Sequence, residues 1–218
     1  AVMLLKQLFD QQSSTYTYIL ADPASGEAVI IDPVAEQIDR DLTLLSELGL
    51  ELIYTLDTHV HADHITAGGE IRRRTGAVSG VAAAANVSCV DRALEHGDRL
   101  RLGSYTLEVR STPGHTSGCL TYVIQAQSNT LAFTGDTLLI RGCGRTDFQQ
   151  GSASELYQSV HQQIYTLPKD TMIYPGHDYR GHTSSTIAEE QAHNPRLNLG
   201  IRESAFIELM TKLNLAHP

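Results

Sequence analysis

In the first quarter of the chain, short apolar runs typical of strands are separated by a stretch with the apolar spacing of a helix. Two apolar runs predict strands at Thr15–Leu20 and Ala28–Asp32. A helix is predicted next, because apolar residues recur at helical spacing; they are Ile38, Leu42, Leu45 and Leu48. Gly49 stands where helices commonly end, and the apolar run Glu51–Asp57 predicts a buried strand after it. This strand–helix–strand order favours an α/β fold.

The rest of the chain continues the same mixture of strands and helices. Gly68–Thr75 is expected to belong to a helix. Further strands are predicted at Leu100–Arg110, Leu120–Gln125, Thr130–Thr134 and Thr171–Tyr174. Ser152 and Glu155 form a capping box, and the helix it opens has one apolar face, made of Leu156, Val160, Ile164 and Leu167. From Thr183 the tail predicts two helices separated by Pro195, and the last one has an apolar face of Phe206, Ile207, Met210 and Leu213.

Composition narrows the function classes without naming one. The 218 residues carry a formal net charge of −9, which argues against a nucleic-acid surface. No run of about 18 apolar residues could span a bilayer, and we expect neither a membrane partner nor a secretion signal. Cys89, Cys119 and Cys143 are odd in number and scattered, which indicates a reducing compartment rather than a disulfide framework.

Four short motifs with His or Asp each follow a predicted strand. They are Thr58–His64 (THVHADH), Thr112–His115 (TPGH), Thr134–Asp136 (TGD) and Tyr174–Asp178 (YPGHD). Loops at strand ends are where α/β proteins commonly bind ligands, so these four can converge at one sheet edge. A single such histidine is more often a hydrogen-bonded loop residue than a ligand. Four loops together predict a metal site, and imidazole with carboxylate suits zinc, iron or manganese alike.

The residues of these motifs, and their order along the chain, resemble those of a known superfamily. THVHADH followed by TPGH, TGD and PGHD is similar to the metallo-β-lactamase fold, which implies an αββα sandwich with the metal at one edge. The run Leu139–Gly151 (LIRGCGRTDFQQG), together with YPGHDYRG and NPRL, more closely resembles the persulfide dioxygenases, or sulfur dioxygenases. That family includes the protein linked to ethylmalonic encephalopathy. We therefore expect residues 1–218 to form a single domain of this fold with a short C-terminal helical tail.

The resemblance implies one non-haem Fe(II) per chain, held by His59, His115 and Asp136. Two histidines and one carboxylate leave positions open for both O2 and a sulfur substrate, and zinc offers no redox states. The remaining candidates would orient ligands and waters from the second shell; they are His61, Asp63, His64 and His177. Equivalents of these four complete a second metal site in dinuclear hydrolases of the fold, so the sequence leaves a second metal open.

The family substrate is glutathione persulfide, which O2 and water convert to sulfite and glutathione. Arg196 is the first candidate for binding a glutathione carboxylate, with a helix-flanking surface charge as the alternative. Tyr179 is the second candidate, as a hydroxyl donor. Arg145 and Asp147 are expected to pair and brace their loop. Cys143 is either a thiol near the persulfide path or, as we favour, a small buried residue.

Other functions remain as alternatives at this point. The strongest is a glyoxalase II-like dinuclear thioester hydrolase (a hydroxyacylglutathione hydrolase), although only a short tail follows His177 where that family has a helical domain. A β-lactamase and a non-catalytic metal-binding or sulfur-binding protein fit less well. The resemblance also implies a homodimer, in the bacterial cytoplasm or, for a eukaryotic protein, the mitochondrial matrix.

Overall fold

The computed structural model of the chain describes residues 2–60, 62–87, 90–147 and 151–216; at 62–66 and 214–216 it describes the backbone alone. The first sheet has the order β1-β2-β3-β4-β5-β6. Its strands are β1 (Leu4–Asp10), β2 (Thr15–Asp22), β3 (Glu27–Ile31), β4 (Glu51–Leu56), β5 (Val78–Ala82) and β6 (Arg92–Leu94). Strands β1 to β3 pair antiparallel, and β3 to β6 pair parallel.

The second sheet has the order β12-β11-β10-β9-β8-β7. Its strands are β7 (Arg99–Leu102), β8 (Tyr105–Ser111), β9 (Leu120–Ala126), β10 (Asn129–Gly135), β11 (Met172–Pro175) and β12 (Ser185–Thr186). All neighbours pair antiparallel except β10 and β11, which are parallel. The carboxyl ends of β10 and β11 therefore point the same way and bring their loops together.

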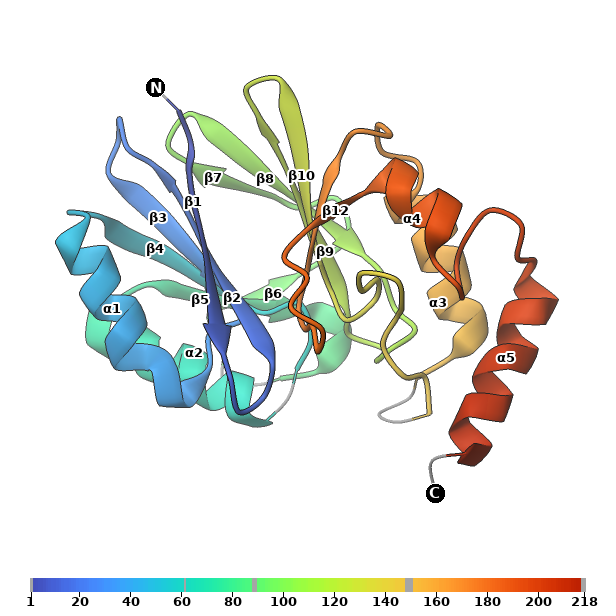
Figure 1. The fold of residues 1–218 in the computed structure, drawn as a ribbon. Helices are drawn as coiled ribbons and strands as arrows, with labels where there is room; N and C mark the ends of the chain where they lie inside the picture. The colour runs from blue at the N-terminus through green and yellow to red at the C-terminus, as the bar shows by residue number, and fades with distance from the viewer. Residues whose placement is uncertain (1, 61, 88–89, 148–150, 217–218) are drawn as a thin grey trace.

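Helices cover the outer face of each sheet (Figure 1). The helices α1 (Ile38–Glu47) and α2 (Ala62–Thr75) lie against the first sheet. The helices α3 (Ala153–Ser159), α4 (Ile187–His193) and α5 (Glu203–Ala216) lie beside the second. Among the described residues, no helix is long and apolar enough to cross a membrane.

Three apolar clusters hold these four layers together. The central cluster lies between the sheets and includes Tyr18, Leu56, Tyr122 and Phe133. One outer cluster joins the first sheet to α1 and α2, and the other joins the second sheet to the C-terminal helices. β2 is buried along its whole length and β3 along all but its first residue, Glu27, as expected of strands covered on both faces. The αββα sandwich is confirmed.

Most predicted elements are present, with a few differences. The predicted strand Leu100–Arg110 is wrong as one element, because Gly103 takes a positive φ and turns it into the hairpin β7–β8. The prediction that Ile207 belongs to the last apolar face is also wrong, since it is 37% exposed while Phe206 and Met210 are buried. Ser152 does cap α3 by accepting from Glu155 N, and the helix continues as a π-helical turn at Val160–Ile164.

Candidate metal centre

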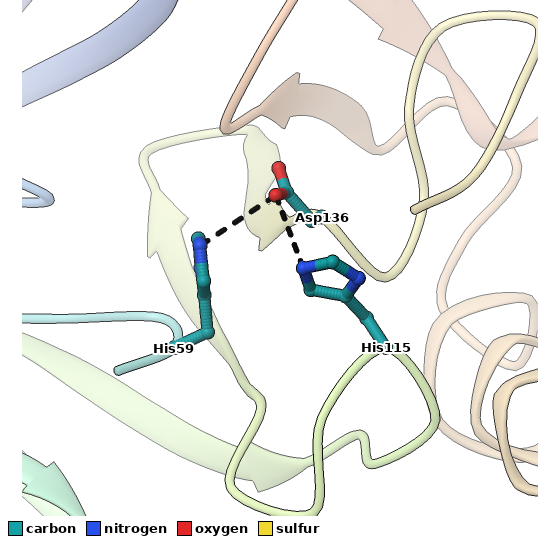
Figure 2. Close-up of side chains that lie close together, drawn as sticks. All are labelled: His59, His115 and Asp136. Carbon is teal, nitrogen blue, oxygen red and sulfur yellow. Dashed lines mark ion pairs between the residues drawn. The ribbon is translucent and has the colours of Figure 1, made fainter. Parts of the chain in front are cut away.

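Three of the candidate residues meet at the edge where the two sheets approach each other. His59 follows β4, His115 follows β8 and Asp136 follows β10. Figure 2 shows both imidazole rings directed at the carboxylate of Asp136. The Nε2 atoms of His59 and His115 lie 3.5 and 3.4 Å from Asp136 Oδ2. All three side chains are buried, so the cluster faces little bulk water.

His59 is oriented by a buried carboxylate that the sequence did not single out. Asp32, at the end of β3, accepts from the backbone N of Thr58 at 2.8 Å and from its hydroxyl at 2.7 Å. The Thr58 oxygen lies 3.1 Å from His59 Nδ1. Because the single Thr58 proton is donated to Asp32, the Thr58 oxygen accepts from His59, and Nδ1 carries the imidazole proton. Nε2 is then the nitrogen that offers a lone pair to a metal.

His115 is fixed in the same tautomer by a backbone group. Its Nδ1 lies 2.7 Å from the carbonyl oxygen of Arg145. A carbonyl oxygen can only accept, so Nδ1 donates and Nε2 faces Asp136. The carbonyl is part of the loop that the side chain of Arg145 braces, through two hydrogen bonds of 2.7 and 2.6 Å to Asp147. The expected pairing of Arg145 with Asp147 is therefore present.

Asp136 uses its two oxygens for different purposes. Oδ2 faces the two Nε2 atoms, while Oδ1 accepts from His177 Nδ1 at 2.6 Å. Burial alone would raise the pKa of Asp136, but the neighbouring histidine rings, His59 first among them, outweigh it and hold the pKa well below its ordinary range. The carboxylate is thus ionised at neutral pH, as a metal ligand must be.

The TGD motif places this carboxylate through its glycine. Gly135 has a φ of +56°, a left-handed conformation that favours glycine. An added Cβ would also lie 2.5 Å from Oγ1 of Thr58, the residue that orients His59. The glycine therefore lets β10 approach the His59 loop closely enough for the two ligands to meet. Thr134 is buried beside it and donates to the carbonyl of Leu138 at 2.7 Å.

The donor set fits a divalent transition metal. The three ligand atoms all lie within 4.8 Å of one another. Two ligands at about 2.1 Å from a metal lie roughly 3.0–3.5 Å apart, depending on geometry. The observed 3.4 and 3.5 Å separations fall in that range without rearrangement. Two imidazoles and one carboxylate would hold such an ion and leave positions open for other ligands.

Of the four remaining candidates, only His177 has a side chain among the described residues. His177 contacts Asp136 directly, through a hydrogen bond of 2.6 Å from Nδ1 to Oδ1. His61 lies outside the described residues, and the side chains of Asp63 and His64 are also not described. Asp178 anchors its loop by accepting from the backbone N of Arg180 and of His182, at 3.0 and 2.6 Å.

A cavity of about 730 Å³ opens beside the metal cluster, a volume typical of small-molecule sites. Its lining combines His115, Asp136 and His177 with the polar groups Arg145, Tyr179 and Arg196 and an apolar wall; the wall includes Leu139, Cys143, Met210 and Leu213. The Tyr179 ring lies parallel to that of His177, at a centroid distance of 6.2 Å, and remains 74% exposed. A partly charged and partly apolar substrate matches this lining.

A network of buried hydrogen bonds around Asn194 fixes the position of the Arg196 backbone. Asn194 Oδ1 accepts from the backbone N of Arg196 at 2.9 Å, and its Nδ2 donates to Gly142 O at 3.2 Å. The same Nδ2 donates to the fully buried Glu190 at 3.0 Å, and Glu190 also pairs with Arg141. This network fastens the Arg196 loop to the loop that carries Cys143.

The two described cysteines are buried thiols. Desolvation raises the pKa of Cys143 to about 11, partly offset by Arg196, and it raises the pKa of Cys119 to about 11 as well. Cys143 Sγ lies 3.9 Å from both Arg196 Nη1 and Met210 Sδ. The packing agrees with a small buried residue, although Cys143 does line the cavity.

Comparisons with known proteins agree with this geometry. The family model described as the metallo-beta-lactamase superfamily matches residues 11–177. The chain is 51% identical over 218 residues to the human "Persulfide dioxygenase ETHE1, mitochondrial", covering all of this chain and 84% of the relative. The chain therefore belongs to the metallo-beta-lactamase superfamily and, within it, to the persulfide dioxygenase family.

The degree of similarity to other known proteins distinguishes the two main candidate functions. The crystal structure of ETHE1 from Myxococcus xanthus superposes with a TM-score of 0.91 at 50% identity, over 99% of this chain and 93% of that one. The hydroxyacylglutathione hydrolase of Cereibacter sphaeroides is 36% identical over 188 residues, covering 85% of this chain and 71% of the relative. The chain is thus less similar to this hydroxyacylglutathione hydrolase, the relative that represents the glyoxalase II-like alternative, than to the proteins named ETHE1.

Proposed function

We propose that this chain is a glutathione-dependent persulfide dioxygenase with one non-haem Fe(II), held by His59, His115 and Asp136. The observation that carries the proposal is the coincidence of that triad with full-length similarity to proteins named persulfide dioxygenase. The reaction converts glutathione persulfide, O2 and water to glutathione and sulfite.

The protein's part in this reaction is to define the ligand set and to bind the substrate. Iron supplies the redox chemistry with O2, for which zinc has no accessible states. The groups on their Nδ1 atoms orient His59 and His115 so that each would offer Nε2 to the metal, and Asp136 contributes one negative charge. Such a triad leaves three coordination positions open.

The cavity supplies the substrate side of the proposal. Arg196 lines it, with its backbone held by Asn194 and its Nη1 3.9 Å from Cys143 Sγ, and its guanidinium is our candidate for binding a glutathione carboxylate. Tyr179 lines the same cavity and offers a hydroxyl. Cys143 stays protonated at neutral pH because desolvation raises its pKa to about 11, so its thiol does not compete as a nucleophile.

The ligand assignment is tested by three alanine variants. His59→Ala, His115→Ala and Asp136→Ala should each lose bound iron and persulfide-dependent O2 uptake together. His193→Ala, an exposed histidine in the last turn of α4, serves as the control and should retain both. A triad variant that keeps full iron content would refute the ligand set.

The substrate assignment is tested separately. Arg196→Ala should raise KM for glutathione persulfide about tenfold or more with iron content unchanged, because it removes binding already made in the ground state. Arg99→Ala, an exposed arginine on β7, is the matched control. An unchanged KM in Arg196→Ala would remove this residue from the substrate site.

We further propose that the protein forms a homodimer and works in a reducing compartment, the bacterial cytoplasm or the mitochondrial matrix. The two described cysteines are unpaired with each other, which supports a reducing environment. Light scattering of the purified protein tests the dimer, and a mass of about 24 kDa would contradict it.

A further inference from the structure

His177 is held between the carboxylate of Asp136 and a hydroxyl from the other sheet. Its Nδ1 lies 2.6 Å from Asp136 Oδ1, and its Nε2 lies 3.1 Å from Oγ1 of Thr15. A ring nitrogen can bind a metal only through its lone pair. The ionised carboxylate of Asp136 can only accept, so Nδ1 carries a proton, and Nε2 can bind a metal only if its hydrogen bond with Thr15 breaks.

The contact with Asp136 matters for a second metal in another way. Two metals in one site lie about 3.5–4 Å apart, a spacing that a shared ligand commonly bridges. In this structure Oδ2 of Asp136 faces His59 and His115, which leaves Oδ1 as the oxygen that could bridge. The hydrogen bond from His177 occupies Oδ1, so this ring stands where a bridged second metal would attach.

Thr15 is itself firmly placed at the start of β2. It is 2% exposed, and its hydroxyl lies 2.8 Å from that of Ser13, in the turn between β1 and β2. Ser13 donates to Asp10 at 2.6 Å, and Asp10 accepts a further bond from Gln37 at 2.9 Å. The chain of hydrogen bonds thus runs from the first sheet and its neighbouring helix to the metal centre.

Backbone pairing fixes the same contact. Thr15 and His177 form an isolated antiparallel bridge between the two sheets. Tyr16 N donates to Gly176 O at 2.9 Å, and Asp178 N donates to Ser14 O at 3.2 Å. The side chain of Thr15 is therefore delivered to His177 by the register of this bridge and not by a mobile side-chain contact.

We infer that Thr15 is a positioning residue that keeps the site mononuclear, by holding His177 on Asp136 and away from a second metal ion. The inference rests on the proposed metal site and adds what selects one ion over two. It assigns a role to the turn between β1 and β2, which contributes no ligand. Removing the hydroxyl takes away one of the hydrogen bonds that hold the ring, and the second site becomes easier to fill.

The test is Mn²⁺ binding by Thr15→Val, with Thr15→Ser as the conservative variant that keeps the hydroxyl. Thr171→Val is the matched control, because Thr171 is equally buried but lies at the opposite end of β11 from His177. Equilibrium dialysis counts Mn²⁺ per chain, and electron paramagnetic resonance detects spin-coupled pairs, which a merely structural effect would not create.

We expect second-site occupancy at subsaturating Mn²⁺ to rise about fivefold in Thr15→Val, the effect of losing one hydrogen bond. Thr15→Ser and Thr171→Val should match the wild type. Equal second-site occupancy in Thr15→Val and wild type would overturn the inference, as would a rise in Thr15→Ser of the same size. If Thr15→Val does not fold, the exposed Ser13→Ala decides, with about a twofold rise expected and no rise overturning the inference.

The wild-type protein separates this inference from the proposed function. If it binds two Mn²⁺ with similar affinity, the proposed single-metal site fails whatever Thr15 does. If it binds one Mn²⁺ and Thr15→Val behaves identically, the single-metal site stands and only the role of Thr15 is lost.

Discussion

Gly144 allows the metal-site loop to close over two of the ligands, and replacing it with alanine should push them apart. An added Cβ would lie 2.7 Å from Nδ1 and 2.9 Å from Cγ of His115, and in closer contact still with the backbone oxygen of Asp136. Contacts between such atoms ordinarily begin near 3.4 Å. The loop cannot simply move away, because Gly144 N donates to that same Asp136 oxygen at 2.6 Å.

The expected size follows from these overlaps. Overpacking a well-packed site costs about 1–3 kcal/mol, and each kcal/mol lowers Tm by roughly 2–4 °C in a chain of this length. The ring of His115 must shift from the carbonyl of Arg145 that fixes its tautomer. Disturbing such a partner typically weakens metal binding by about 10–100-fold. Gly144→Ala should therefore lose both stability and iron affinity.

Gly142→Ala is a control in the same loop. Its added Cβ would meet nothing nearer than Leu139 Cβ, at 4.0 Å. We expect its stability within about 0.5 kcal/mol of wild type and its iron affinity unchanged. Iron affinity is measured by competition with a chelator under anaerobic conditions, and Tm by circular dichroism. Wild-type iron affinity in Gly144→Ala, or an equal loss in Gly142→Ala, would refute the steric reasoning.

Three further predictions concern buried polar groups. Glu190→Gln should lower the free energy of unfolding by about 2–4 kcal/mol in urea titrations, because it removes the buried charge that pairs with Arg141. A loss of less than about 0.5 kcal/mol, the usual size of a surface effect, would contradict this. Desolvation raises the pKa of Asp41 from 3.8 to about 6, so the folded state favours the protonated form and loses stability as pH rises from 4 through 6. Asp41→Asn should then be about 1–2 kcal/mol more stable than wild type at pH 7.5 and equal to it near pH 4; equal stability at both pH values refutes the burial argument. Cys143 and Cys119 should resist iodoacetamide at pH 8 in the folded protein, and rapid labelling of either on mass spectrometry would contradict their raised pKa.

The sequence was sufficient for the elements whose patterns are local. The helical spacing of Ile38 to Leu48 with Gly49 after it predicted α1 and its end, and Gly49 has a φ of +67° as such a position requires. The four His/Asp motifs predicted a cluster because each follows a strand, and all four meet: three supply His59, His115 and Asp136, and His177 of the fourth contacts Asp136. These signals need only neighbouring residues along the chain.

Other features depend on contacts that no local pattern encodes. Asp32 orients His59 through Thr58, although 26 residues separate Asp32 from Thr58. Thr15 reaches His177 across 162 residues, through a bridge between two sheets. The hairpin at Gly103 was missed because apolar residues alternate on both sides of it. Positions of this kind depend on which distant segments lie side by side in the fold, and local periodicity along the chain does not specify that.

The number and identity of the metals distinguish the proposed oxygenase from a dinuclear hydrolase most directly. The protein is purified anaerobically, its iron and zinc are counted per chain, and O2 uptake is followed after addition of glutathione persulfide. We predict one iron per chain, O2 uptake that depends on the persulfide, and release of sulfite. Two metals per chain, no O2 uptake and cleavage of S-lactoylglutathione would contradict the account and identify a thioester hydrolase.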